Sequence, residues 1–386
     1  MKILHIIGTL NTGGIQKFIL QLSQSTPLKK YKHQVLCTIQ SIDNNKDEYE
    51  KNNIIIHHLP FTFYPKAHIP YRLDKLLRYF FSKLYIFRLW YYLIKSEADI
   101  YHTHIHIQII SQILAAVLSG KKMIWSIHGE YSLSILTIFF LRALDFILSD
   151  KKFRYIADSI SALHSTLPFT VKKYKMENII PTGINLKPYL KEYDQLLIRE
   201  KYNIKDETIL IGSTGRIVWQ KGYDQLLSLL ENYDFGENIF HILIAGDGSL
   251  RDKFIKRIRE NKLESHITFI GNIKNIPEFL SALDIYIQPS VTEGFPLSVL
   301  EAMASGLPII CSDAGGLKEM LQNKETGIIY KTGDINSLYN SLYKIFSMPP
   351  EELFQLGLNS RKEIITNYSI NNIAIQYKNI YSTACL

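Results

Sequence analysis

Two glutamates, Glu293 and Glu301, stand eight positions apart in the stretch Glu-Gly-Phe-Pro-Leu-Ser-Val-Leu-Glu. Proline is favoured at the first helical position, so Pro296 predicts a helix start and a short apolar helix over residues 297–305. A helix N-terminus presents unpaired N–H groups and the positive end of a dipole, which suit a phosphate. Ionised carboxylates only accept hydrogen bonds, so they suit sugar hydroxyls. A ligand with sugar hydroxyls on both sides of a diphosphate is a nucleotide sugar, and this spacing predicts a site for one.

A basic loop follows the first expected strand of the C-terminal half. Residues 212–222 read Gly-Ser-Thr-Gly-Arg-Ile-Val-Trp-Gln-Lys-Gly, which places Arg216 and Lys221 on one loop before a helix. A guanidinium can hold two phosphate oxygens at once, and an ammonium adds a compact positive charge. We therefore expect both side chains to bind the diphosphate; a solvated basic loop is the alternative.

Three glycine turns follow other expected strands. Gly246 lies in Ala-Gly-Asp-Gly after one strand, and Asn272 follows the next, where it could frame a base. Gly14 lies in a loop over residues 8–16 that resembles a phosphate-binding loop but lacks the G-x-G-x-x-G spacing. Glycine either lets a ligand approach closely or simply makes a turn, so each signal is weak by itself.

Several histidines lie at expected strand ends. His102, His104 and His106 share one face of a strand and could converge on a metal. No Asp or Glu accompanies them nearby, and strand-end histidines with hydrogen-bonding roles are commoner, so we expect no metal. His128 ends the following strand, where it could donate to a sugar hydroxyl or a phosphate; a structural histidine is the alternative.

The length and the cysteines favour a two-domain cytoplasmic protein. A chain of 386 residues suffices for two domains of ordinary size. The 3 cysteines lie far apart and predict neither a disulfide framework nor a zinc site, which fits a reducing compartment. No signal peptide is visible, and the most apolar stretch, residues 132–148, is interrupted by Arg142 and Asp145. We expect a soluble or peripheral protein.

The charge is concentrated in the N-terminal half. Residues 1–180 carry 23 Lys and Arg against 12 Asp and Glu, a net charge of +11, whereas the remainder carries 21 against 24, a net of −3. This excess predicts an anionic partner: a membrane surface, a lipid phosphate or nucleic acid. The aromatic and basic segment Tyr71–Lys95 could lie on an anionic bilayer. Ordinary core packing with snorkelling basic side chains fits it equally well.

Both halves alternate short β-rich runs with amphipathic helical patterns, which predicts an α/β fold with parallel sheets. A strand-like run over 178–185 would end the first domain, and helical spacing over 369–381 predicts a helix that packs back on it. Ligands of such sheets bind beyond the carboxyl ends of the strands, where most candidate residues fall. The expected strands cover 2–7, 34–39, 54–58, 100–103, 123–127 and 155–157 in the first half, and 209–213, 240–245, 267–270, 285–288, 308–311 and 327–330 in the second.

The order and separation of these motifs make the chain similar, over nearly its whole length, to the retaining glycosyltransferases of family 4 (glycosyl transferases group 1), which have the GT-B fold. This resemblance implies two Rossmann-like domains that face a central cleft: an acceptor-binding domain over 1–185, a donor-binding domain over 186–368 and a returning helix over 369–386. Asn185 stands where the family usually has Asp, and Gln16 where Glu is common; both are expected to be structural. The matching motifs are Glu293…Glu301, Gly215-Arg216…Lys221-Gly222, Ala245-Gly-Asp-Gly248, Gly13-Gly14 and Pro181-Thr-Gly-Ile-Asn185.

The resemblance also implies a role for each residue. Arg216 and Lys221 would clamp the donor diphosphate, and Glu301 would bind the ribose hydroxyls. Glu293 would contact the donor sugar near its reacting end, and His128 would approach that sugar. Gly14 would touch the phosphate from across the cleft. The reaction would need neither a metal nor a cofactor. The backbone of residues 294–298 at the helix start would add N–H donors. The remaining donor-binding candidates are Gly246, Asn272, Gly294, Phe295, Pro296, Leu297 and Ser298.

The expected reaction is transfer of a hexose or N-acetylhexosamine from a nucleoside diphosphate, UDP by family frequency, with retained configuration. No nucleophile suggests itself, so the family implies a front-face displacement in which the leaving phosphate takes the acceptor proton. The acceptor would be lipid-linked or polysaccharide, in capsule, exopolysaccharide or lipopolysaccharide synthesis at the inner face of a bacterial membrane. Three alternatives remain: a GT-B nucleotide-sugar epimerase, a basic nucleic-acid-binding protein that leaves both glutamates without a role, and, least favoured, a metal hydrolase built on the histidines.

Overall fold

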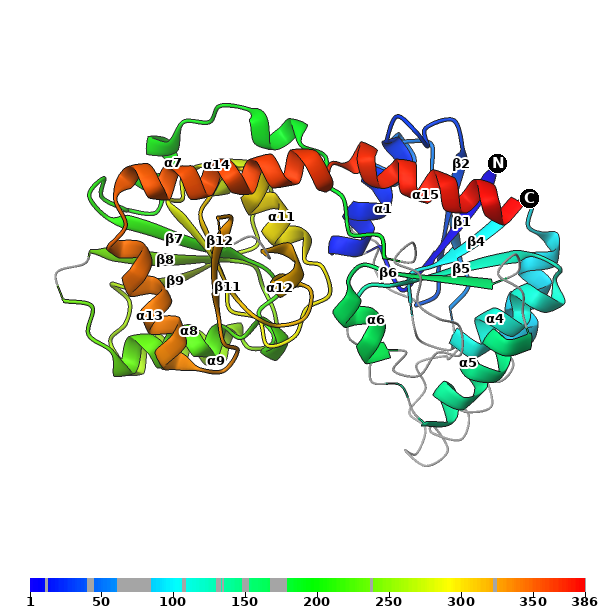
Figure 1. Ribbon diagram of the computed structural model, residues 1–386, viewed down its shortest axis with the longest axis horizontal. Coiled ribbons are helices and arrows are strands. Elements are labelled where there is room, and N and C mark those ends of the chain that lie inside the picture. The colour runs from blue at the N-terminus through cyan, green and yellow to red at the C-terminus, as the bar shows by residue number, and fades with distance from the viewer. Residues whose placement is uncertain are drawn as a thin grey trace. The chain divides into compact units, whose positions relative to one another are not determined.

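The computed structural model forms two compact units, one of residues 1–181 with 371–386 and the other of residues 182–370 (Figure 1). Each unit is built on a six-stranded sheet whose strands are all parallel. Both sheets confirm the predicted parallel α/β class. The structure describes residues 1–10, 13–39, 45–60, 85–105, 109–129, 133, 135–147, 153–166, 179–236, 239–321 and 325–385.

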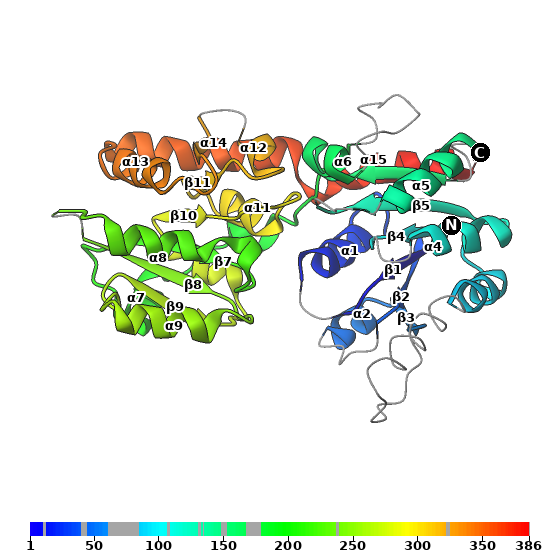
Figure 2. The ribbon, with the colours of Figure 1, turned by 90° about the horizontal axis from the view of Figure 1, so that it is seen from below.

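The sheet of the N-terminal unit has the order β3-β2-β1-β4-β5-β6 (Figure 2). One of its faces packs on residues 85–95, which are helical, and on α4 and α5. The other face packs on α1, α2 and the C-terminal helix α15. The elements are β1 (Lys2–Ile7), α1 (Gly14–Gln24), β2 (Lys32–Cys37), α2 (Lys46–Lys51), β3 (Ile55–His58), β4 (Ile100–Thr103), α4 (Ile109–Leu118), β5 (Lys122–Ile127), α5 (Ile135–Ile147), β6 (Phe153–Ala157), α6 (Ile160–Thr166) and α15 (Ile370–Cys385).

The sheet of the C-terminal unit has the order β12-β11-β10-β7-β8-β9 and lies between two apolar cores. One core includes residues of α7, α10, α11 and α14, and the other includes residues of α8, α9 and α13. The elements are η2 (Lys187–Leu190), α7 (Gln195–Lys201), β7 (Ile209–Thr214), η3 (Trp219–Lys221), α8 (Tyr223–Asn232), β8 (Phe240–Ala245), α9 (Arg251–Glu260), β9 (Ile267–Gly271), α10 (Ile276–Ser281), β10 (Ile285–Gln288), α11 (Leu297–Ala304), β11 (Ile309–Ser312), α12 (Leu317–Met320), β12 (Gly327–Tyr330), α13 (Ile335–Phe346) and α14 (Pro350–Asn367).

All twelve predicted strands are present, with ends shifted by two residues at most. The predicted strand over 178–185 is wrong for its described part, because residues 179–185 make only single bridges, Ala157 with Ile179 and Ile184 with Ser369. Pro181 lies between them and has no N–H for a strand ladder. Pro296 is the N-cap of α11, with ψ 123°, rather than its first helical residue.

The C-terminal helix α15 belongs to the N-terminal unit (Figure 1). At its start the Asn371 Oδ1 accepts the N–H of Thr26 at 3.1 Å, and farther along the ring of Tyr377 lies 5.9 Å from that of Phe18 on α1. Two ends of the chain are therefore packed into one core.

The aromatic and basic segment is described only from residue 85 onward. Here Tyr85, Leu89 and Leu93 are buried in the core, whereas Phe87 and Tyr91 are 63% and 57% exposed. Residues 71–84 of the predicted membrane segment lie outside the described residues. Within the described residues, no helix combines the length and the apolar composition needed to span a bilayer.

Candidate functional site

The C-terminal unit brings three of the predicted side chains to one end of its sheet. Arg216 follows β7, Lys221 ends η3, and Glu293 lies between β10 and α11. Because β7 and β10 are neighbouring parallel strands, their carboxyl ends open on the same edge. The N-terminus of α11 reaches this edge directly after Glu293.

Lys221 and Glu293 form an ion pair at this edge. The Lys221 ammonium contacts the Glu293 Oε1, and the two side chains are only 15% and 12% exposed. Ser290 Oγ donates a second hydrogen bond to the same Oε1 at 2.7 Å. A charge that is mostly removed from water needs such partners, so the lysine and the glutamate hold one another in place.

A buried glutamine, which the sequence analysis did not select, supports this pair. Gln288 is the last residue of β10 and is fully buried. Its Nε2 donates to Ser290 Oγ at 2.8 Å, and its Oε1 accepts from Tyr286 at 3.0 Å and from Ser298 Oγ at 3.2 Å. Gln288 therefore joins the two serines that precede and follow Glu293. The available signal was a polar residue that ends an apolar strand.

The N-terminus of α11 is open. Val299 and Leu300 donate their N–H groups to the Pro296 carbonyl at 3.2 and 3.4 Å, and no side chain caps the helix. Among the described residues, the backbone N–H groups of Gly294, Phe295, Leu297 and Ser298 have no acceptor. These donors and the helix dipole give the edge a positive potential without a charged side chain.

Two predicted ligand residues turn their side chains away from this edge. Phe295 is 6% exposed and packs against Tyr368, with ring centroids 5.2 Å apart, and Leu297 is 8% exposed in the same core. Both can therefore offer a ligand their backbone N–H but not their side chain. Pro296 has no N–H and can contribute only its shape.

Glu301 lies on the buried side of α11 and is 6% exposed. The hydroxyl of Tyr189, on η2, donates to its Oε1 at 2.9 Å. Burial, and then the negative charge of Glu301, raises the pKa of Tyr189, so the tyrosine remains a hydrogen-bond donor. One carboxylate oxygen of Glu301 is thus already oriented by the protein.

Arg216 is exposed, and among the described residues its guanidinium makes neither an ion pair nor a hydrogen bond. Gly246 lies beside its loop, and a Cβ there would be 1.9 Å from the Gly215 carbonyl oxygen. Glycine therefore lets the two loops touch at this edge. Asn272 is exposed after β9.

Two predicted residues, Gly14 and His128, lie in the N-terminal unit. Gly14 is the first residue of α1, which has no side-chain cap; residues 11–12 of its loop lie outside the described residues. His128 follows β5 and has both ring nitrogens directed at residues of its own unit. Its Nε2 is 2.9 Å from Nδ1 of His104, and its Nδ1 is 3.6 Å from Oδ2 of Asp158.

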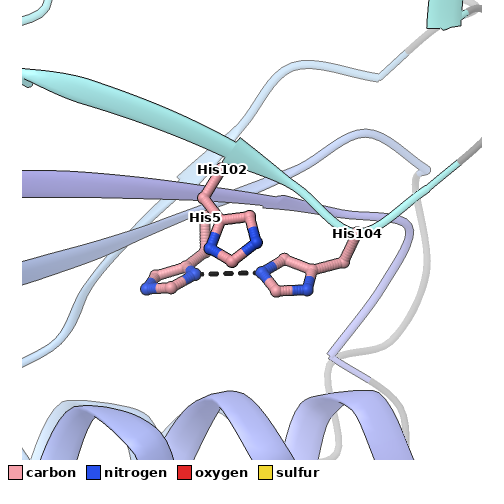
Figure 3. Close-up of side chains that lie close together, drawn as sticks. All are labelled: His5, His102 and His104. Carbon is pink, nitrogen blue, oxygen red and sulfur yellow. Dashed lines mark hydrogen bonds between the residues drawn. The ribbon is translucent and has the colours of Figure 1, made fainter. Parts of the chain in front are cut away.

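Among the described residues, three buried histidines form a group whose composition would suit a metal, and one of them, His104, contacts His128. One ring nitrogen from each of His5, His102 and His104 lies within 4.8 Å of the others (Figure 3). His102 directs its two nitrogens at the hydroxyls of Tyr381 and Ser126, each at 2.7 Å. Burial holds the pKa of each of the three imidazoles well below its usual value. His106, the third histidine of the predicted group, lies outside the described residues.

Comparison with known proteins matches both units. The family described as Glycosyltransferase Family 4 matches residues 12–187, and Glycosyl transferases group 1 matches residues 194–365. The chain is 26% identical to the Escherichia coli UDP-Gal:alpha-D-GlcNAc-diphosphoundecaprenol alpha-1,3-galactosyltransferase, over 53% of each protein. It is also 26% identical to the lipopolysaccharide core biosynthesis mannosyltransferase LpsB of Rhizobium meliloti, over 53% of this chain and 60% of LpsB. The chain thus spans little more than half the length of these relatives.

The crystal structure of Anabaena HepE in complex with UDP and glucose resembles this chain with a TM-score of 0.80. The two are 17% identical, and the similarity covers 99% of each chain, so it defines the fold. The sucrose-phosphate synthase of Thermosynechococcus elongatus has the same fold at 20% identity, with a TM-score of 0.73 over 99% of this chain and 98% of the synthase. Together with the two family matches, this architecture identifies the chain as a member of the family 4 glycosyltransferases (glycosyl transferases group 1), with the GT-B fold.

Proposed function

We propose that this protein transfers a hexose or N-acetylhexosamine, with retained configuration, from UDP to a lipid-linked or polysaccharide acceptor in bacterial surface-polysaccharide synthesis. One observation carries the proposal: Arg216, Lys221 and the open start of α11 lie together at one sheet edge. The names of the E. coli and R. meliloti relatives support it, because both describe sugar transfer. Family membership favours transfer over nucleotide-sugar epimerisation and over nucleic-acid binding.

The donor diphosphate gains negative charge as its bond to the sugar breaks. The unpaired Arg216 guanidinium can hold two phosphate oxygens. The free N–H groups of Gly294, Phe295, Leu297 and Ser298 can donate hydrogen bonds to the remaining phosphate oxygens. Lys221 would exchange part of its contact with Glu293 for the phosphate. These positive groups are preorganised, so we propose that no metal is required; removing one such donor costs roughly 3 kcal/mol of barrier.

The glutamates fit the hydroxyl groups of the donor. Glu301 is held by Tyr189 from one side, and we propose that it accepts hydrogen bonds from the ribose. Glu293 is fixed by Lys221 and Ser290, and we propose that it contacts the transferred sugar. Carboxylates in a partly desolvated site discriminate strongly against a ligand that lacks the matching hydroxyl.

We further propose that the N-terminal unit binds the acceptor and lies on the inner face of the cell membrane. Its net charge of +11 over residues 1–180 suits an anionic lipid surface or a lipid diphosphate. Exposed apolar side chains on α5, including Ile135 and Phe139, offer a surface for the lipid interface.

The test is thermal stabilisation of the purified chain by a panel of nucleoside diphosphates and their sugars, with and without chelator. We expect one base to raise the melting temperature, to keep that effect in chelator, and to lose it in Arg216→Ala. Arg259→Ala is the matched control, since Arg259 is exposed on α9, away from the strand ends. Stabilisation by none of the nucleotides, or stabilisation that Arg216→Ala leaves unchanged, contradicts the proposal.

A further inference from the structure

A network of hydrogen bonds lies at the strand ends of the C-terminal unit, around the side-chain amide of Gln288. This amide is fully buried at the end of β10. It contacts Ser290 on one side and both Tyr286 and Ser298 on the other. Ser290 and Tyr286 are also fully buried, whereas Ser298 lies in the first turn of α11. We call these four residues the amide network.

The amide network adjoins two parts of the candidate site. Ser290 Oγ lies 2.7 Å from Oε1 of Glu293, the same oxygen that Lys221 contacts. Ser298 supplies one of the free backbone N–H groups at the start of α11. The network therefore connects the carboxylate that we propose contacts the sugar with the helix start that we propose binds the diphosphate.

The chemistry of Glu293 determines the direction of the first hydrogen bond. Glu293 is a carboxylate paired with Lys221, and a carboxylate can only accept. Its contact with Ser290 needs a proton, which the Ser290 hydroxyl must supply. A hydroxyl carries a single proton, so Ser290 has to accept from its other partner in the network.

Gln288 extends this direction across the network. The amide atom 2.8 Å from Ser290 Oγ has to be the nitrogen Nε2, because Ser290 has no second proton to donate. The opposite atom is then the oxygen Oε1, which can only accept. Tyr286, at 3.0 Å, and Ser298, at 3.2 Å, therefore both donate to it. An amide rotated by half a turn would compete with Glu293 for the proton of Ser290.

Tyr286 is placed to donate in this way. Its hydroxyl accepts the backbone N–H of Thr214 at 3.2 Å and lies 3.1 Å from Thr214 Oγ1. The carbonyl of Thr214, at 3.3 Å, is a more distant acceptor than Gln288 Oε1. Burial raises the pKa of Tyr286, so the hydroxyl keeps its proton. Because Arg216 follows Thr214 by two residues, the network also reaches the loop that carries this arginine.

We infer that the charge of Glu293 orients the whole amide network, and that Gln288 is a positioning residue for this carboxylate. The hydroxyl proton of Ser298 is held by Gln288 and is not available to a ligand. The start of α11 then binds the diphosphate through backbone N–H groups, and the Ser298 side chain only supports them. This inference deepens the proposed function and rests on it for its consequences in binding and turnover.

Nucleotide binding tests the direction of the Ser298 hydrogen bond. Titration calorimetry with UDP compares the unaltered chain with Ser298→Ala. We expect the affinity to change by less than threefold, because the proton that is lost faces Gln288. A hydroxyl that donates to a phosphate makes a charge-assisted hydrogen bond, whose loss weakens binding by about tenfold or more. A decrease beyond threefold overturns the inferred direction.

Turnover tests the positioning of Glu293. Ser290→Ala and Gln288→Met should each lower kcat by about tenfold and change the affinity for UDP by less than threefold. Gln288 acts on Glu293 through Ser290, so the double variant should be no slower than the slower single variant. Independent effects would multiply to about 100-fold. That result overturns the inference, as does a kcat of Ser290→Ala within twofold of the unaltered chain.

Two variants provide matched controls for these substitutions. Ser360 is fully buried on α14 and donates to the carbonyl of Thr326, and Gln112 is buried on α4 of the N-terminal unit. Ser360→Ala and Gln112→Met each alter a buried polar side chain of the same type and should keep kcat. A loss of kcat equal to that of the network variants would mean that destabilisation alone lowers turnover, and would overturn the positioning role.

Urea unfolding without ligand separates this inference from the proposed function. Ser290→Ala leaves Nε2 of Gln288 without its acceptor, so the unfolding midpoint should fall. Adding Gln288→Met removes the unpaired donor and should lower the midpoint no further; additive decreases overturn the network. A chain that does not bind UDP would contradict the proposed function, and the unfolding cycle would still decide the network. If Gln288→Met does not fold, the two serine variants decide it through UDP affinity and kcat.

Discussion

Lys221 is the residue on which the proposed chemistry depends most directly. Its ion pair with Glu293 is largely buried, whereas Lys256 pairs with Glu260 on the surface of α9 and is 76% exposed. We expect Lys221→Met to reduce kcat by about 100-fold, because a preorganised charge at the leaving phosphate is removed. Steady-state turnover at saturating donor measures this change.

The surface pair provides the control for this prediction. Lys256→Met loses an exposed i,i+4 pair, which contributes about 0.5 kcal/mol or less to stability, and should keep full turnover. Turnover of Lys221→Met within a few-fold of the unaltered chain would show that Lys221 only balances the charge of Glu293.

Tyr189 lies on η2 and orients Glu301 through a hydrogen bond. Its hydroxyl donates to Glu301, whereas the hydroxyl of Tyr193 donates to the Pro188 carbonyl at 3.2 Å. A hydrogen bond to a charged group contributes about 1.5–3 kcal/mol, so we expect Tyr189→Phe to weaken nucleotide binding by about tenfold. Titration calorimetry with the stabilising nucleotide measures it. Tyr193→Phe should bind normally, and equal affinities in all three proteins would remove Tyr189 from the site.

At the scale of elements, Gly222 lies between η3 and α8, as the C-cap of the first and the N-cap of the second. Its φ is +64°, and a Cβ would lie 1.9 Å from the Pro289 carbonyl oxygen. Gly236 has a φ of +61°, and nothing among the described residues lies within 4 Å of its Cβ position. Both alanine variants incur about 1–2 kcal/mol of left-handed strain, and Gly222→Ala adds a clash of roughly 1–3 kcal/mol.

Urea unfolding of the two alanine variants separates these effects. Gly222→Ala should be the less stable and should also lose turnover, because the displaced turn carries Lys221. Equal destabilisation by both substitutions would mean that the turn adjusts without cost, and that the contact with Pro289 does not hold η3 in position.

The elements were largely predictable from the sequence, because buried parallel strands are continuous apolar runs bounded by turns. The helix start after Glu293 was predictable for a similar reason, since proline restricts the backbone at a known place. Phe295 was assigned to the ligand from its neighbours in the motif. Its side chain packs in the core. This could not be predicted, because a residue's place in a loop does not determine which way its side chain points.

The cluster of buried histidines in the N-terminal unit was not predictable, because it depends on register. His5 and His102 are directly opposite one another in the pairing of β1 with β4, and His33 comes from a third strand. A sequence pattern gives the period of each strand but not the alignment of distant strands. The support of Glu293 by Gln288 was not predictable either, because Gln288 joins a strand end to a helix start through side-chain hydrogen bonds that no sequence pattern specifies.

At the scale of the whole molecule, the buried histidines make the N-terminal unit sensitive to acid. The pKa of His33 is lowered to about 4 by burial, against about 6.5 in an unfolded chain. The unfolded chain therefore binds more protons between these values, and stability is lost as the pH falls from 6.5 toward 4. At pH 5 this loss amounts to about 2 kcal/mol for His33.

Fluorescence of the buried Trp125 during urea unfolding follows the N-terminal unit, whereas Trp219 of the C-terminal unit is 60% exposed. The unfolding midpoint reported by Trp125 should drop between pH 7 and pH 5, and His33→Gln should reduce that drop. His164→Gln changes an exposed residue of α6 and should leave it unchanged. A midpoint that is constant over this range would contradict the neutral state of the buried imidazoles.

The uneven distribution of charge and apolar surface bears on where the molecule works. Residues 1–180 carry a net charge of +11, and Ile135 and Phe139 are 87% and 65% exposed one turn apart on α5. Phe354 is 68% exposed on α14 of the C-terminal unit, which lacks that charge.

We expect the protein to bind vesicles that contain anionic lipid, with an affinity that weakens as salt is added. The double variant Ile135→Ser and Phe139→Ser should bind about tenfold more weakly. Sedimentation with anionic and neutral vesicles measures both effects. Phe354→Ser should bind as the unaltered chain does. Equal binding to neutral vesicles, or undiminished binding of the double variant, would contradict attachment of the N-terminal unit to an anionic bilayer through α5.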